Sequence, residues 1–225
     1  MTALYESDLS AIRAARLRNC PKCLIYPLTM AFSQQTTDRW AEIQHTISEV
    51  LEGRLIRPEI SLDGAPAPAK LATFTTAILA DVDVAGDEVA SGRLVILHEP
   101  QGHDSWDGNV RFVGFVRSEL ETELVTDSLL LEVGWTWVED ALAQRGTHPV
   151  ALSGTVSRAG SQSFGDIAER EPEGSVEIRV SWTVPETDSI EQHILAWCDM
   201  LSSTAGLEPL PEGVSSISRS GPKLK

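Results

Sequence analysis

The segment SVEIRVSWTV, residues 175–184, decides the fold class because it is the clearest strand in the sequence. Apolar side chains occupy its even positions from Val176 to Trp182, and polar side chains occupy its odd positions from Glu177 to Thr183. Strict alternation is typical of a strand that turns one face toward a core and the other toward solvent. The segment therefore predicts a sheet with one inward face.

Four other segments complete the predicted sheet: residues 73–84, 89–98, 110–117 and 149–158. Leu94-Val95-Ile96-Leu97 is apolar on both faces, which is typical of a central strand. Short connections between the first three of these strands favour antiparallel pairing. Residues 57–69, which are rich in proline, are instead predicted to be a stiff, extended connector.

Three segments show the apolar spacing of an amphipathic helix. They span residues 38–52, 128–145 and 189–205, and a glycine that suits a helix C-terminus follows each of them. In the second helix the predicted apolar stripes are Leu130, Val133, Trp137 and Ala141, and beside them Leu131, Trp135, Val138 and Leu142. Cys198, on the third helix, is expected to pack as a small apolar residue.

The order α-β-β-β-α-β-β-α predicts one α+β domain over residues 33–206, with an antiparallel five-stranded sheet and three helices. Residues 1–32 are expected to be an N-terminal extension that is disordered or lies upstream of the true start, for which Met30 is a candidate. Residues 207–225 are expected to be a disordered tail. In the extension, Cys20 and Cys23 lack the second pair that a tetrahedral zinc site needs.

Charge and hydropathy restrict the classes of partner. The chain has 33 acidic and 18 basic residues, a formal net charge of −15. A surface of that charge repels phosphate backbones, so we expect no nucleic-acid partner. No apolar run approaches the roughly 20 residues that cross a bilayer, so we expect no membrane partner. Three cysteines without a secretory leader argue against a disulfide framework.

The densest polar cluster is HEPQGHDSWDGN, residues 98–109. His98, His103, Asp104 and Asp107 are residue types that ligate divalent cations. Their spacing matches no zinc motif, so we favour a solvated hairpin loop in which Trp106 folds back over the sheet. None of the five histidines has a recognisable nucleophile context, and we predict no catalytic residue, metal or cofactor.

A second candidate is SGTVSRAGSQSFG, residues 153–165, whose glycines and hydroxyls suit an anion and whose Arg158 supplies charge. The segment matches neither a P-loop nor a nucleophile elbow. We favour the alternative of a long, mobile loop over residues 159–173 between two strands.

The chain has six tryptophans, and most fall on or beside apolar faces. Core packing accounts for them, and a groove for a partner peptide is the alternative. Trp135 and Trp137 point about 200° apart on one helix, so one of the two is a candidate for exposure at an interface.

The sequence resembles an uncharacterised actinobacterial family known as domain of unknown function 3000. The segments that carry the resemblance are GRLVILH (92–98) with Gly102-His103, EVGWTW (132–137), SGTVSR (153–158) with Phe164-Gly165 and AER (168–170), EIRVSW (177–182), and AWCD (196–199). The resemblance covers residues 33–206 and implies a cytoplasmic bacterial protein without implying an activity. Leu131 stands where the family is expected to favour proline.

The element order also resembles that of small acidic secretion chaperones, which are dimeric α+β domains that bind extended protein segments. We therefore predict a non-enzymatic cytoplasmic adaptor or chaperone-like module, a homodimer, that binds a protein partner through an apolar sheet or helix face. The candidate binding residues are Trp135, Trp137, His98, His103, Trp106, Arg158 and Phe164. The alternative is a small-molecule or metal-dependent enzyme that uses the His98–Asp107 loop, with Arg158 and Ser163 nearby.

Overall fold

The computed structural model describes residues 38–52, 55–68 and 70–208. The chain divides into two compact units, residues 1–44 and 45–225. The described part of the first unit is helical, and the helix continues in the second unit to residue 51. This confirms the first predicted helix. The predictions for residues 1–32 and for most of the C-terminal tail fall outside the described residues.

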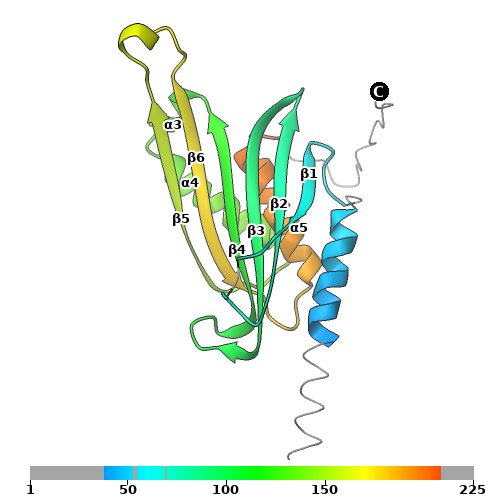
Figure 1. The fold of residues 1–225 in the computed structure, drawn as a ribbon. Helices are drawn as coiled ribbons and strands as arrows, with labels where there is room; N and C mark the ends of the chain where they lie inside the picture. Colours follow the sequence, from blue (N-terminus) through cyan, green and yellow to red (C-terminus); the bar gives the residue numbers. More distant parts are fainter. Residues whose placement is uncertain (1–37, 53–54, 69, 209–225) are drawn as a thin grey trace, which may run out of the picture. The chain divides into compact units, whose positions relative to one another are not determined.

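The second unit is built on one antiparallel sheet with the strand order β1-β2-β3-β4-β6-β5. The strands are β1 (Ile60–Ala65), β2 (Phe74–Val84), β3 (Asp87–His103), β4 (Gly108–Leu120), β5 (Val150–Ser161) and β6 (Glu173–Thr183). The helices that follow β4 and β6 are α3 (Thr122–Thr126), α4 (Leu130–Gln144) and α5 (Ile190–Thr204). Figure 1 shows α4 and α5 behind the sheet, on one of its faces. The α+β class and the antiparallel sheet are thus confirmed.

The predicted numbers of strands and helices were too low: the described residues hold six strands and four helices. The missed strand, β1, lies in the proline-rich segment. Its prolines flank Ile60–Ala65 and do not interrupt it, so this edge strand keeps the amide groups that pair it with β2. The missed helix, α3, has five residues, too few for a helical period to be visible.

The hairpins are also longer than predicted. β3 continues to His103 and pairs there with Gly108 of β4. β5 continues to Ser161, so the connection to β6 is shorter than the predicted loop over residues 159–173 and contains one 3-10 turn, Gly165–Ile167.

The core lies between the sheet and the helices. Cross-strand register places the even-numbered residues of the strands on the helix side, and Ile78, Phe112 and Trp182 there are fully buried. Trp197 of α5 lies over Gly92, where an added Cβ would come within 2.8 Å of its ring. Cys198 is buried beside it, as predicted.

Helix α4 buries a narrower stripe than predicted. It contacts α5 and the edge strand β5, and it buries Leu130, Gly134, Val138, Ala141 and Leu142. Gly134 rests against Val156 of β5, since an added Cβ would lie 2.8 Å from that side chain. Leu131 and Val133, which were assigned to the stripes, point away from these contacts and are exposed.

Candidate binding site on the open face of the sheet

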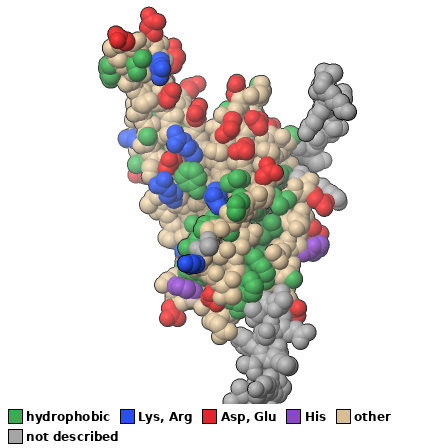
Figure 2. Space-filling model, viewed as in Figure 1, with side chains coloured by type: hydrophobic (Ala, Val, Ile, Leu, Met, Phe, Trp, Pro, Cys, Tyr) green, Lys and Arg blue, Asp and Glu red, His purple; other side chains and the backbone are tan. Residues whose placement is uncertain are grey.

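The face of the sheet opposite α4 and α5 is formed by odd-numbered strand residues, and we call it the open face. Register aligns these residues in rows that run across the strands. The first row is Leu79, Arg93, Phe115, Arg179 and Thr155, and the second row is Ala77, Val95, Val113, Ser181 and Ser153. Figure 2 views this face and shows apolar side chains and several basic ones gathered on it.

Over β3, β4, β5 and β6 these two rows form a shallow, open hollow of about 520 Å³. Its lining residues come from β3, β4, β5 and β6: Arg93, Val95, Val113, Gly114, Phe115, Ser153, Gly154, Thr155, Arg179, Val180 and Ser181. Valines and Phe115 line the hollow at β3 and β4 beside Arg93, and hydroxyl groups line it at β5 and β6 beside Arg179 and Val180. A ligand with one apolar and one polar end fits this arrangement.

Two arginines flank Phe115 in the first row. Arg179 lies over the Phe115 ring, with 5.6 Å between its guanidinium carbon and the ring centroid, and donates a hydrogen bond of 2.8 Å to Glu177. Arg93 donates through Nη2 to the carbonyl oxygen of Pro66 at 2.7 Å. Each guanidinium is therefore held in place while most of its five N–H donors stay available.

A third arginine, Arg111, is buried next to the hollow and is 8% exposed. Its Nη1 donates to the carbonyl oxygen of Ala151 at 3.0 Å and to Thr183 Oγ1 at 3.1 Å, and its Nη2 donates to Ser181 Oγ at 2.7 Å. Desolvation by burial lowers the pKa of Arg111 from its ordinary value. Among the described residues neither Arg111 nor Arg93 forms an ion pair with a carboxylate.

A β-bulge supplies one of these contacts. The register of β5 against β6 shifts between Val150 and Ser153, and Ala151 in the bulge has a positive φ of 48°. A bulge re-aims the backbone locally, and here the Ala151 carbonyl accepts from Arg111.

Part of the β2–β3 side of the open face is covered. Ala77, Val95 and Leu97 form a small buried cluster, and Trp106 packs against it together with Ala65, Ala67 and Ala72. This confirms that Trp106 folds back over the sheet. His103 stacks on Trp106 with 4.6 Å between the ring centroids.

The predicted His98–Asp107 loop is not a single loop, and the structure separates its histidines. His98 lies within β3 on the buried side, stacks on Phe74 and contacts the Asn109 carbonyl through Nδ1 at 3.2 Å. His103 ends the strand and is exposed. In the described part of the chain, no three His, Cys, Asp or Glu side chains come together in a group that would hold a metal ion.

The other predicted binding residues lie outside the hollow. Trp135 and Trp137 are both half-buried, and Trp135 donates to Glu139 at 3.0 Å. Arg158 donates to the Asp127 carbonyl, and Phe164 is 75% exposed at the tip of the β5–β6 hairpin. The predicted anion cradle over residues 153–165 is thus divided: Ser153 and Thr155 line the hollow, whereas Arg158 and Phe164 do not.

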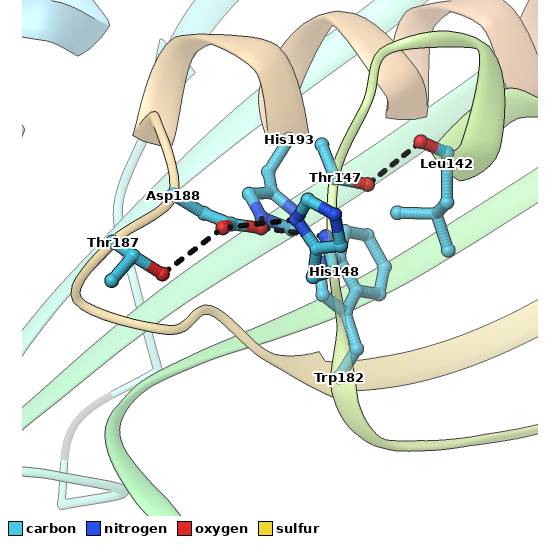
Figure 3. A network of polar contacts seen from close by, with 7 residues as sticks. All are labelled: Leu142, Thr147, His148, Trp182, Thr187, Asp188 and His193. Atoms are coloured by element: carbon cyan, nitrogen blue, oxygen red, sulfur yellow. Dashed lines mark hydrogen bonds and ion pairs between the residues drawn. The ribbon is translucent and has the colours of Figure 1, made fainter.

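A buried polar network lies at the start of α5 (Figure 3). His193 Nδ1 accepts from the Trp182 indole at 2.9 Å, and its Nε2 is 3.2 Å from Asp188 Oδ2. Asp188 also accepts from the His148 amide at 2.6 Å. Both ring nitrogens of the fully buried His193 are engaged, so the network ties β6 to α5 and offers no free base.

Opposing effects set the two pKa values in this network. Burial lowers the pKa of His193, against the opposing effect of Asp188. Burial by itself would raise the pKa of Asp188, but hydrogen bonds from His148 and His193 outweigh it and hold that pKa below its usual range.

Sequence reasoning missed the residues that form the hollow, above all Val113, Phe115, Arg93 and Arg179. A signal was present in the strands predicted over 89–98 and 110–117, because their outward positions carry valine, leucine and phenylalanine beside arginine. A purely solvated face seldom gathers several large apolar residues.

Fold and site together define a class: an α+β domain whose single antiparallel sheet is covered by helices on one face and has an apolar, arginine-bearing hollow on the other. The chain belongs to the family described as protein of unknown function (DUF3000), whose model matches residues 40–215, more than three quarters of its length. No curated protein and no solved structure matches the chain. Within the described residues, every helix is too short or too polar to span a bilayer.

Proposed function

We propose that this protein is a non-enzymatic, cytoplasmic adaptor or chaperone-like module that binds an extended protein segment on its open face. The observation that carries the proposal is the gathering of exposed apolar side chains and arginines there. Val113 is 40% exposed in the middle of the sheet, and Leu79 is exposed in the neighbouring row. Large apolar residues in such a position on a sheet are typical of binding surfaces.

Charge favours an acidic partner segment. Arg93 and Arg111 lack carboxylate partners among the described residues, although the chain as a whole carries a net charge of −15. A segment that presents leucine-like and acidic side chains would bury Val113 and neutralise the arginines at the same time. Burial of one such apolar side chain contributes about 1.5–3 kcal/mol.

The enzyme alternative has less support. It requires His98, His103 and Asp107 to converge, and in the described structure His98 packs in the core while His103 stacks on Trp106. Arg158, which that alternative places nearby, is engaged with the Asp127 carbonyl.

Fluorescence anisotropy with defined peptides tests the proposal. The probe is a short, capped, labelled peptide of alternating leucine, glutamate and serine, and lysine replaces glutamate in its comparison peptide. We expect the acidic peptide to bind more tightly, and Val113→Asn to weaken it about tenfold. Val133→Asn is the matched control, because Val133 is 42% exposed on α4, away from the open face. This variant should bind the acidic peptide with unchanged affinity.

The proposal would be overturned if neither the acidic peptide nor the lysine peptide bound. An equal loss of affinity in the Val113 and Val133 variants would also overturn it, since the peptide would then not lie on the open face. Thermal melting of each variant checks that the fold is intact.

A further inference from the structure

We infer that the hollow is a selective site for a side-chain carboxylate that adjoins an apolar side chain of the bound segment. The inference rests on the proposed function and specifies what its site recognises. The apolar neighbour would lie on Val113, beside the buried Val95, and the carboxylate would lie toward Arg179, Ser181 and Ser153.

Two guanidinium groups line the hollow on either side of Phe115. Arg93 and Arg179 lie in the same row with Phe115 between them, so their backbones are separated by two strand spacings, about 10 Å. Because Arg179 itself lies over the ring, an anion would lie beside its guanidinium on the side of Ser181 and Ser153, and Arg93 would add positive charge from the opposite side of the hollow. Arginine donors match the two oxygens of a carboxylate, and hydrogen bonds to charged groups are the stronger ones.

Both guanidiniums are positioned before any ligand binds. The Phe115 ring and Glu177 hold Arg179, and the Pro66 carbonyl holds Arg93. Pre-positioned side chains lose less conformational entropy on binding, which favours affinity. Glu177 belongs to the row on the far side of Arg179 and does not line the hollow, so it leaves the Ser181 side of Arg179 open.

The buried Arg111 orients a hydroxyl donor on the side of the hollow where the carboxylate would lie. A guanidinium only donates, so Ser181 Oγ must accept from Arg111, and its own proton is then directed elsewhere. Ser153 Oγ lies 3.5 Å away and faces the same hollow. The Arg111 charge, which no described carboxylate neutralises, favours an anion at this position.

The test compares the glutamate peptide with a version in which glutamine replaces glutamate, which keeps the shape and removes the charge. For the unmodified protein we expect the glutamine peptide to bind at least about tenfold more weakly. Arg93→Gln and Arg179→Gln should each reduce this difference between the two peptides. Arg117→Gln should preserve it, because Arg117 contacts Glu177 on the same face but lies outside the hollow.

Ser181→Ala is a further variant that removes only the oriented hydroxyl, and it should weaken the glutamate peptide more than the glutamine peptide, because the hydrogen bond to a charged acceptor is the stronger one. Equal binding of the two peptides to the unmodified protein would overturn the inference while leaving the proposed function intact. The inference would also be overturned, with the proposed function intact, if Arg117→Gln reduced the preference for glutamate over glutamine as much as Arg93→Gln does. If neither peptide binds, the proposed function fails as well.

Discussion

Substitution of Gly92 by alanine should destabilise the protein without altering the open face. Gly92 lies in β3 on the helix side, beneath α5. An added Cβ would lie 2.8 Å from the Trp197 ring, 2.9 Å from Leu201 and 3.0 Å from the Phe115 carbonyl oxygen. Distances under 3.0 Å require a neighbour to shift, and both side chains are fully buried, so α5 must move away from the sheet.

The expected cost follows from overpacking. An extra methyl group forced into a well-packed core costs about 1–3 kcal/mol. The added Cβ of Gly92→Ala would make two contacts under 3.0 Å with fully buried side chains. We therefore expect a cost in the middle of that range, about 2 kcal/mol. For a chain of this length, that corresponds to a fall in Tm of about 4–8 °C.

Urea unfolding monitored by tryptophan fluorescence measures the effect. Gly64→Ala is the matched control, because Gly64 also lies in a strand on the helix side, and an added Cβ there would meet Leu51 at 4.0 Å, an ordinary contact. If Gly92→Ala lost no more stability than Gly64→Ala, the close approach of α5 to β3 would be refuted. The peptide affinity of the folded Gly92 variant should be unchanged.

Three other predictions address the polar network, the buried thiol and the assembly. Burial lowers the pKa of His193 below its ordinary value of 6.5. As the pH falls, this histidine therefore becomes protonated in the unfolded chain before it does in the folded protein. The free energy of unfolding should accordingly keep its full value above pH 6.5 and decrease as the pH falls below it. His193→Gln should flatten this decrease in urea titrations, and an unchanged slope would contradict the assignment. Burial raises the pKa of the Cys198 thiol to about 12, so the peptide that contains it should stay unmodified by iodoacetamide in the native protein and become modified in urea, as mass spectrometry would show. The predicted homodimer should give twice the mass of one chain in light scattering, and a monomer at all concentrations would contradict it.

Local patterns predicted most elements because each signal lies within one segment. Alternation over 175–184 located β6, and the buried even positions from Val176 to Trp182 confirm its inward face. The boundaries of β3 were harder, because Pro100 and Gly102 interrupt the pattern although the hairpin continues past them to His103. Pairing with β4 extends that strand, and no local pattern contains that information.

The hollow was not predictable for a related reason. Arg93, Phe115 and Arg179 come from three strands, and their alignment in one row depends on two registers that the sequence does not state. Read one strand at a time, Arg179 is an ordinary solvated side chain and Phe115 an isolated apolar one. Arg111 was equally hidden, because its hydrogen-bond partners come from β5 and β6, and only the pairing of β4 with β6 and of β6 with β5 brings them to it.

The net charge and the local charge of the open face act over different distances. At physiological ionic strength the field of the whole chain is screened beyond about 8 Å, whereas contacts inside a partly buried hollow are screened much less. The net charge of −15 therefore slows the approach of an acidic segment, and the arginines attract it only after contact. Charge by itself then cannot recruit a partner to this face. An acidic segment is retained when an apolar side chain beside its carboxylates also packs on Val113, which couples recognition of charge to recognition of shape.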